Sequence, residues 1–159
     1  MKQPDPVVNI IIAGLGGQGV LKASDIVAEA AFHAGYDVKK AEVHGMSQRG
    51  GSVACDVRYG KQVFSPMVPR GEADFLVVLA SDQVENNRAQ LRPGGTLIEP
   101  SVVPETVLRN KKSANVFLLG VLSRKLAIPE AAWTEGIRAV LPQKLLDVNL
   151  EAFAAGRSL

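Results

Sequence analysis

Apolar runs and a helical repeat alternate along the first part of the chain. Residues 7–13 are apolar and mostly β-branched except for Asn9, and 38–43, which begins and ends with valine, predicts a second strand. Between them, apolar positions in 20–34 recur every three or four residues, as on one face of an α-helix, and Gly35 follows as a stop. This order of strand, glycine-rich turn, helix and strand predicts the opening of an α/β fold.

The middle of the chain predicts further strands. Residues 52–59 alternate between apolar and polar, and the uninterrupted apolar run at 75–79 is typical of a buried strand. Gly60 and Lys61 predict a tight turn into a short strand at 62–64, which would form an antiparallel hairpin at the sheet edge. The remaining predicted elements are a helix from 81 or 82 to 91, a turn at 93–95, a short strand at 96–98, and helices at 116–126, 129–141 and 145–155.

Composition narrows the class of protein. The 159 residues suit one domain, and 47% hydrophobic residues exclude a disordered chain. The formal charge is +2 with scattered basic residues, so we expect no nucleic-acid partner. The start of the chain is polar and proline-rich, and no apolar stretch is long enough to cross a bilayer. We therefore expect a cytoplasmic protein without a membrane partner.

Cysteine and histidine are scarce. Cys55 is the only cysteine, and it lies in an alternating apolar run, which indicates a buried side chain. One cysteine cannot hold an iron–sulfur cluster, which normally needs four protein ligands. His33 and His44 are too few for a zinc site. We expect no metal site in this chain.

The first glycine-rich segment, at 14–19, has the G-x-G-x-x-G spacing of a dinucleotide-binding turn, between a predicted strand and a predicted helix. The helix N-terminus would present free N–H groups to an anion, and Glu42 stands where a ribose-binding acid belongs. Glycines at such a turn also permit close packing against a neighbouring loop or subunit. The amide of Gln18, where compact residues are usual, favours this second interpretation slightly.

The second segment, at 44–51, has no standard nucleotide-binding role. Arg49 beside two glycines could place one cation on a loop, for binding or for a surface ion pair, and a hydrogen-bonded structural role is favoured for His44. Both segments follow strand ends, so we expect them to share one crevice edge. No pair of carboxylates has a catalytic arrangement, so no catalytic residue is predicted. The candidate binding or interface residues are Gly14, Gly16, Gly17, Gln18, Gly19, His44, Met46, Gln48, Arg49, Gly50 and Gly51.

Four segments of the chain carry a resemblance to a known family, namely Ala13–Gly19, His44–Ser52, Asn115–Gly120 and the tail at 142–153. Through them the chain resembles the gamma-type subunit of 2-oxoacid:ferredoxin oxidoreductases. The Met-Ser-Gln-Arg-Gly-Gly-Ser form at 46–52 is most similar to the beta subunit of the indolepyruvate enzymes. The resemblance covers nearly the whole chain. It implies one gamma-type domain over 1–159 and a three-layer α/β/α, Rossmann-like sandwich with a mostly parallel sheet.

The resemblance also implies a role inside a larger enzyme. Such enzymes use thiamine diphosphate and magnesium to decarboxylate a 2-oxoacid, pass electrons through iron–sulfur clusters to ferredoxin, and form an acyl-CoA. This chain lacks the cysteines and the thiamine diphosphate motif, so these cofactors are expected on partner subunits. The isolated chain is expected to be inactive. Its glycine loops would line a subunit interface near thiamine diphosphate or coenzyme A.

In one place the chain departs from the family pattern. Family members usually carry an additional strand and helix between the predicted strand at 96–98 and the predicted helix at 116–126, for which 100–114 is too short. Two other functions remain open from the residues alone. One is an NAD(P)-dependent oxidoreductase that uses 14–19 and Glu42, and the other is a stand-alone nucleotide-binding regulator.

Overall fold

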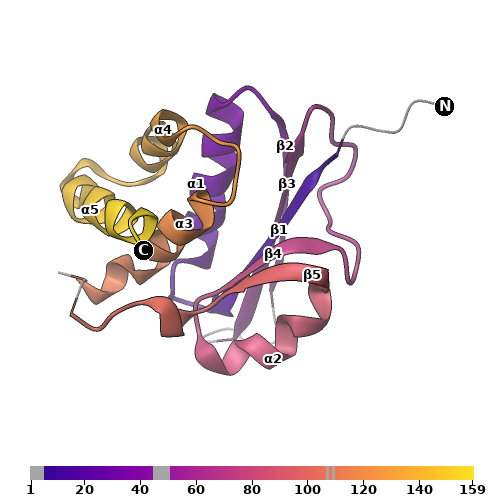
Figure 1. Cartoon of the computed structure of the whole chain (residues 1–159), viewed down its shortest axis with the longest axis horizontal. Helices are drawn as coiled ribbons and strands as arrows, with labels where there is room; N and C mark the ends of the chain where they lie inside the picture. Colours follow the sequence, from indigo (N-terminus) through magenta and orange to yellow (C-terminus); the bar gives the residue numbers. More distant parts are fainter. Residues whose placement is uncertain (1–5, 45–50, 107, 109) are drawn as a thin grey trace.

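The computed structural model describes residues 6–44, 51–106, 108 and 110–159, which form a five-stranded sheet flanked by helices (Figure 1). The sheet order is β2-β3-β1-β4-β5. The α/β fold class predicted from the sequence is therefore confirmed. The strands are β1 (Val8–Leu15), β2 (Asp37–His44), β3 (Ser52–Gly60), β4 (Ala73–Val78) and β5 (Leu91–Ile98).

The sheet is mixed because one strand runs against the others. β1 pairs with β4, and β4 with β5, in parallel. β3 lies between β1 and β2 and is antiparallel to both. The antiparallel hairpin at the sheet edge is thus formed by β2 and β3.

The prediction of a short hairpin strand at 62–64 is wrong. Both edges of β3 are already occupied by β1 and β2, so no edge remains for another strand. Residues 62–64 form an irregular segment instead. The backbone N–H of Val63 donates to Asp37 Oδ2 at 2.8 Å, and the Val63 side chain is buried.

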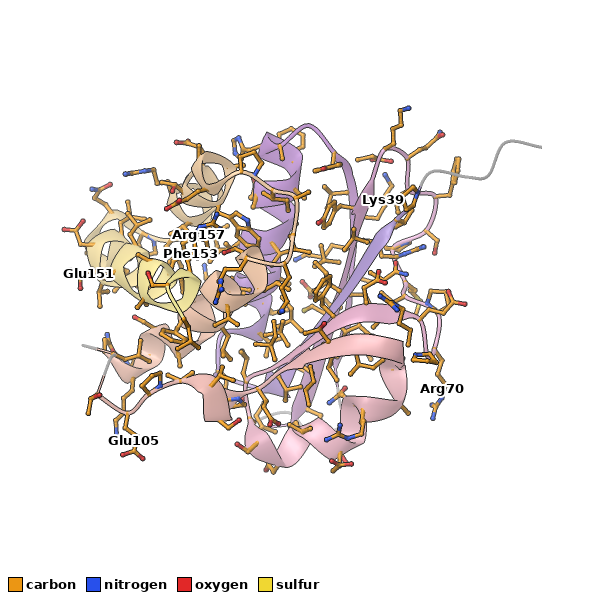
Figure 2. All side chains as sticks on the ribbon, in the orientation of Figure 1. Lys39, Arg70, Glu105, Glu151, Phe153 and Arg157 are labelled. Atoms are coloured by element: carbon orange, nitrogen blue, oxygen red, sulfur yellow. The ribbon has the colours of Figure 1, made fainter. Side chains whose placement is uncertain are left out.

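One face of the sheet carries the main helical layer, which consists of the four longer helices on the left in Figure 1. Trp133 and Phe117 are among its largest fully buried side chains, packed with Ile10 and Ile12 from β1. The tilted rings of Trp133 and Phe153 lie 5.6 Å apart, and Arg157 donates to Ser123 Oγ at 2.9 Å (Figure 2). These helices are α1 (Val20–His33), α3 (Ala114–Ser123), α4 (Glu130–Val140) and α5 (Leu146–Arg157).

The opposite face has a thinner cover. The predicted helix at 81–91 is reduced to the four residues of α2 (Val84–Asn87) between the 3₁₀ turns η1 (Ser81–Gln83) and η2 (Arg88–Gln90). Val84 is the only large apolar residue in 81–90 and packs on the sheet, so no apolar stripe stabilises a longer helix. The predicted turn at 93–95 lies inside β5, where the register with β4 shifts.

The connection between β5 and α3 is short. Its described residues contain only the 3₁₀ turns η3 (Pro100–Val102) and η4 (Lys111–Ser113), and a third turn, η5 (Gln143–Leu145), precedes α5. Among the helices of the described residues, none has the length and apolar character needed to cross a membrane.

Candidate functional site

The glycine turn lies at the point where the sheet changes its winding direction. The chain leaves β1 for α1 on one face, whereas it leaves β4 for α2 on the other face. The carboxyl ends of β1 and β4 therefore border a crevice of the kind in which open α/β sheets bind ligands. Gly17 and Gly19 have φ angles of +86° and +81°, which side chains other than glycine rarely adopt.

Gln18 holds this turn in place. Its Oε1 accepts the backbone N–H of Leu15 at 2.7 Å, and its Nε2 donates to the carbonyl oxygen of Leu79 at 3.4 Å. The side chain thus joins the ends of β1 and β4. A Cβ on Gly14 would lie 2.8 Å from Gln18 Oε1, so a side chain at this position would displace the amide. Gln18 supports the turn from within and leaves Gly17 facing open space.

The two glycine segments meet, as expected from the sequence. The backbone N–H of Gly16 donates to the carbonyl oxygen of Gly51 at 2.9 Å. Leu15 pairs with Ser52, and His44, the last residue of β2, pairs with Val53. The prediction of one shared edge is confirmed for these residues. Four other candidates lie outside the described residues, namely Met46, Gln48, Arg49 and Gly50.

A crevice of about 370 Å³ opens beside the turn. Gly17 and Gly19 line one side, and Lys111, Lys112 and Asn115 line the other. Asn115 Nδ2 donates to the carbonyl oxygen of Gly19 at 3.2 Å, which ties α3 to the start of α1. The first turn of α1 carries no acidic residue, so the helix dipole and the two ammonium groups favour an anion here.

Lys111 and Lys112 are site residues that the sequence alone did not predict. An adjacent lysine pair is usually a solvated surface feature, and nothing local distinguishes 111–112 from Lys39–Lys40. The fold makes the difference, because η4 brings 111–112 next to the glycine turn. Asn115 had a detectable signal, since it belongs to one of the segments on which the family resemblance rests.

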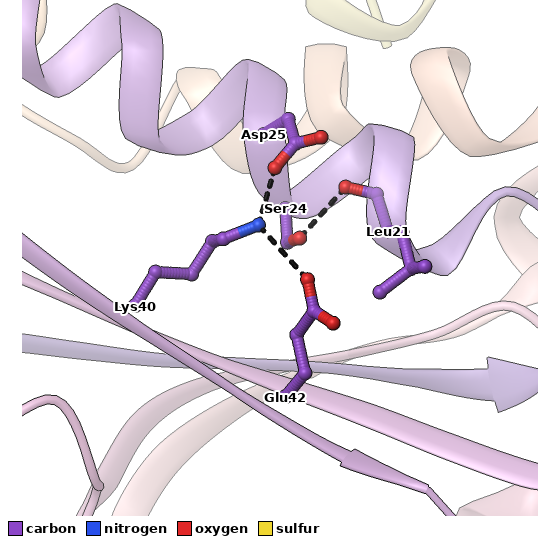
Figure 3. Close-up of polar contacts among 5 residues, drawn as sticks. All are labelled: Leu21, Ser24, Asp25, Lys40 and Glu42. Atoms are coloured by element: carbon purple, nitrogen blue, oxygen red, sulfur yellow. Dashed lines mark hydrogen bonds and ion pairs between the residues drawn. The ribbon is translucent and has the colours of Figure 1, made fainter.

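Glu42 does not occupy the position of a ribose-binding acid. β3 separates β2 from β1, which places the strand that carries Glu42 about 5 Å further from β1 than a neighbouring strand would be. Its carboxylate lies 3.3 Å from Lys40 Nζ, which also binds Asp25 of α1 (Figure 3). Burial alone would lower the pKa of Lys40, but the hydrogen bonds to Asp25 and Glu42 raise it. The ammonium group links β2 to α1.

Cys55 is buried, as predicted. Burial raises the pKa of its thiol, which a hydrogen bond with Ser24 only partly opposes. The Ser24 hydroxyl also donates to the Leu21 carbonyl oxygen at 2.7 Å (Figure 3). A protonated thiol in this position is a packing group and a poor nucleophile.

The fold is a Rossmann-like α/β domain, and its candidate binding edge lies at the carboxyl ends of β1 and β4. The chain belongs to the pyruvate ferredoxin/flavodoxin oxidoreductase family, which it matches over residues 9–105 and 100–159. It is 37% identical to indolepyruvate oxidoreductase subunit IorB of Thermococcus kodakarensis, with 93% of each chain covered. The Pyrococcus horikoshii subunit of the same name is 36% identical over the same shares.

Two solved structures share the fold. The gamma subunit of a keto/oxoacid ferredoxin oxidoreductase from Geobacter sulfurreducens superposes with a TM-score of 0.79 at 21% identity, over 96% of this chain and 95% of that one. The 2-oxoglutarate:ferredoxin oxidoreductase of Magnetococcus marinus, with 2-oxoglutarate, coenzyme A and succinyl-CoA bound, gives 0.80 at 22% identity. That superposition covers 98% of this chain and 31% of the larger one.

The match to the family breaks at the short connection between β5 and α3. The two matched parts of the chain overlap at 100–105. The alignment with the Thermococcus kodakarensis subunit runs over 190 positions, more than the 159 residues of this chain, so it contains positions that this chain lacks. The segment 100–114 was judged from the sequence too short to hold both an additional strand and an additional helix, and its described residues carry the 3₁₀ turns η3 and η4.

Proposed function

We propose that this chain is the gamma-type subunit of an indolepyruvate-class 2-oxoacid:ferredoxin oxidoreductase, in which it forms a single domain over 1–159. The reaction is the oxidative decarboxylation of the 2-oxoacid, with formation of an acyl-CoA and transfer of electrons to ferredoxin. The observation that carries the proposal is the 37% identity to an indolepyruvate subunit over 93% of both chains. Subunits named for ketoisovalerate and 2-oxoglutarate are further relatives, which supports the general reaction class.

In this proposal the chain supplies a binding edge rather than a reacting cofactor. Thiamine diphosphate, magnesium and the iron–sulfur clusters belong to partner subunits. Among the described residues, no three metal-ligating side chains of His, Cys, Asp or Glu lie close enough to share an ion. The chemistry that this chain contributes is the positioning of an anionic group or a partner loop at the glycine edge.

The crevice beside the glycine turn is our candidate for the contact with coenzyme A. Gly17 leaves space for close approach to the backbone, and the start of α1 offers N–H groups. Lys111 and Lys112 add two positive charges on the facing wall. Phosphate groups, of which coenzyme A carries several, are anions that such an arrangement stabilises.

Reconstitution of the complex tests the proposal. The chain is co-expressed with the subunits encoded beside it, and reduction of ferredoxin is followed with indolepyruvate and coenzyme A. We expect co-purification, activity that requires both substrates, and no activity from the isolated chain. A chain that assembles with no such partner would refute the proposed function. Faster turnover of another 2-oxoacid by the complex would refute the indolepyruvate assignment alone.

A further inference from the structure

The face of the sheet opposite α1 is incompletely covered on the side of β2 and β3. Val43, near the end of β2, is 49% exposed, and Met67, between β3 and β4, is 57% exposed. Both line a pocket of about 420 Å³ that opens on this face. The pocket lies on the face of the sheet opposite to the Lys40 side chain. It shares no lining residue with the crevice beside Gly17.

Asp56 of β3 lies deep in this pocket. Only 7% of the residue is exposed, and its Oδ2 accepts the backbone N–H of Val68 at 2.9 Å. Burial raises the pKa of Asp56, and the Val68 hydrogen bond and the charge of Arg58 oppose the rise. Among the described residues, no lysine or arginine forms an ion pair with Asp56. A buried carboxylate with one hydrogen bond is an incomplete site.

The nearest cation on the same strand is committed elsewhere. Arg58 Nε donates to Asn9 Oδ1 at 2.8 Å, and its NH1 donates to the carbonyl oxygen of Ser65 at 2.8 Å. These bonds hold the guanidinium against β1 and the 61–72 segment. Any direct ion pair for Asp56 must therefore come from a group that enters the pocket.

The wall of the pocket is rich in ordered acceptor groups. Gln83 is 8% exposed, and its Oε1 accepts the Ser52 hydroxyl at 2.8 Å and Asn86 Nδ2 at 3.4 Å. Asn87 Nδ2 donates to the carbonyl oxygen of Gln83 at 2.8 Å. Because each asparagine turns its amino group toward Gln83, its oxygen remains available as an acceptor in the pocket that Asp56 also lines.

We propose that this pocket receives an arginine side chain of a partner subunit, with the guanidinium against Asp56 and the asparagine oxygens. The proposal rests on the proposed function, because it requires a complex. A guanidinium carries five donors and no acceptor, which complements a pocket lined by a carboxylate and by asparagine side chains with available oxygens. Val43 and Met67 would cover the apolar stem of the arginine. Buried arginines in such pockets are typical binding hot spots.

Assembly of the complex provides the first test. Asp56→Asn keeps the size of the side chain and an acceptor for the Val68 N–H, but removes the charge. We expect it to raise the dissociation constant for the partner subunit by at least about tenfold. The matched control is Asp82→Asn, on an exposed side chain of η1, which should leave the constant unchanged. An unchanged constant for Asp56→Asn would overturn the proposal.

A charge exchange distinguishes a direct contact from an indirect effect. Asp56→Arg should abolish assembly, and aspartate in place of the partner's arginine should restore it. The free Asp56→Asn chain should melt at the same temperature as the wild type or higher, because it no longer buries an unpaired charge. Failure of every arginine of the partner to restore binding would refute the direct contact.

The free chain provides a second test that needs no partner. Ethylguanidinium at millimolar concentration serves as the probe, and the NMR signal of the Asp56 carboxyl carbon reports on it. We expect the probe to shift this signal in the wild type and to leave the pocket of Asp56→Asn unperturbed. If no complex forms, the proposed function fails, and this titration still decides whether the pocket binds a guanidinium.

The same measurement separates a partner's arginine from one of this chain. In the free chain, Asp56 should titrate above the ordinary value of 3.8, and in the complex below it. A low value already in the free chain, raised by Arg49→Ala, would mean that Arg49 fills the pocket, and this would overturn the proposal.

Discussion

Gly120 of α3 and Gly156 of α5 face each other where the two helices cross. A Cβ on Gly156 would lie 3.2 Å from the Cα of Gly120 and would overlap the carbonyl oxygen of Phe117. A Cβ on Gly120 would overlap the carbonyl oxygen of Phe153. The two backbones therefore approach too closely for any side chain. This contact closes the helical layer that supports α1 and the glycine turn.

Alanine at either glycine should destabilise the fold. Because the clashing atoms belong to backbone, the helices must move apart, and overpacking of this kind costs about 1–3 kcal/mol. Chemical unfolding followed by the fluorescence of Trp133, the only tryptophan and fully buried, measures the effect. Ala154→Ser, at an exposed position of α5, is the control and should stay within about 0.5 kcal/mol of the wild type. Wild-type stability in Gly120→Ala would contradict the close approach of the helices.

Asp37 should make stability depend on pH. Its hydrogen bond from the Val63 N–H, and then its contact with Lys39, lower the pKa of its carboxyl group below 3.8. Stabilisation by the carboxylate is therefore fully present above the unfolded pKa and is lost as the pH falls through the folded pKa. Asp37→Asn should be less stable than the wild type at pH 7, and the difference should shrink as the pH falls below 3.8 and through the lowered pKa of the folded state. A difference that stays the same as the pH falls would contradict this.

The isolated chain should not bind NAD(H) at micromolar concentrations. The inserted β3 removes Glu42 from the ribose position, and Glu42 is paired with Lys40. Isothermal titration calorimetry with NAD⁺ and NADH should show no saturable heat. Saturable micromolar binding that Gly16→Val abolishes would instead identify the turn as a dinucleotide site.

Replacement of both Lys111 and Lys112 by alanine should weaken the use of coenzyme A. Hydrogen bonds to charged groups contribute about 1.5–3 kcal/mol, so the KM for coenzyme A in the reconstituted complex should rise at least about tenfold. The kcat should change little, because the lysines would contact a distant part of the substrate. The double variant of Lys125 and Lys144, both exposed elsewhere on the chain, is the charge-matched control. An unchanged KM would contradict the proposal that coenzyme A binds in this crevice.

Arg49→Ala tests whether the second glycine segment acts across a subunit boundary. We expect the free chain to melt at the wild-type temperature, while assembly or coenzyme A-dependent turnover weakens. A buried charged contact of this kind typically costs about 2–5 kcal/mol when it is truncated. Normal assembly and turnover would show that Arg49 is a surface ion pair, and an unfolded variant would show that it is structural.

Helices and strands with a strong periodic pattern were predicted from the sequence more accurately than the pairing of the strands in the sheet. β1 and the apolar face of α1 were predicted because both are buried in the fold, and buried positions leave a continuous or periodic apolar pattern in the sequence. The position of β3 was not, because an alternating strand shows which face is buried but not which strand lies beside it. The mistaken strand at 62–64 has the same cause. Local glycine signals suggested a hairpin, but both edges of β3 were already occupied.

The candidate site was predicted only as far as local motifs reach. The glycine spacing at 14–19 predicted a strand-to-helix turn. The structure adds that Gly51 contacts this turn through one backbone hydrogen bond, from the N–H of Gly16. The Lys111–Lys112 pair and the pocket over Asp56 depend on contacts between distant segments, which leave no local pattern. Gln18 marked a departure from dinucleotide turns, although its hydrogen bonds with Leu15 of β1 and with Leu79, just after β4, became visible only in the structure.

The antiparallel placement of β3 also bears on the order in which the sheet assembles. β2 and β3 are adjacent in the chain and can pair through a short hairpin, whereas β1 must wait for Tyr59 to reach Val8 and for Phe75 to reach Ile10. Pairings between distant residues form slowly because the intervening chain must first be brought together. During synthesis, β1 therefore remains an unpaired apolar strand until β3 and then β4 have emerged, and that interval is when the nascent chain is most exposed to aggregation.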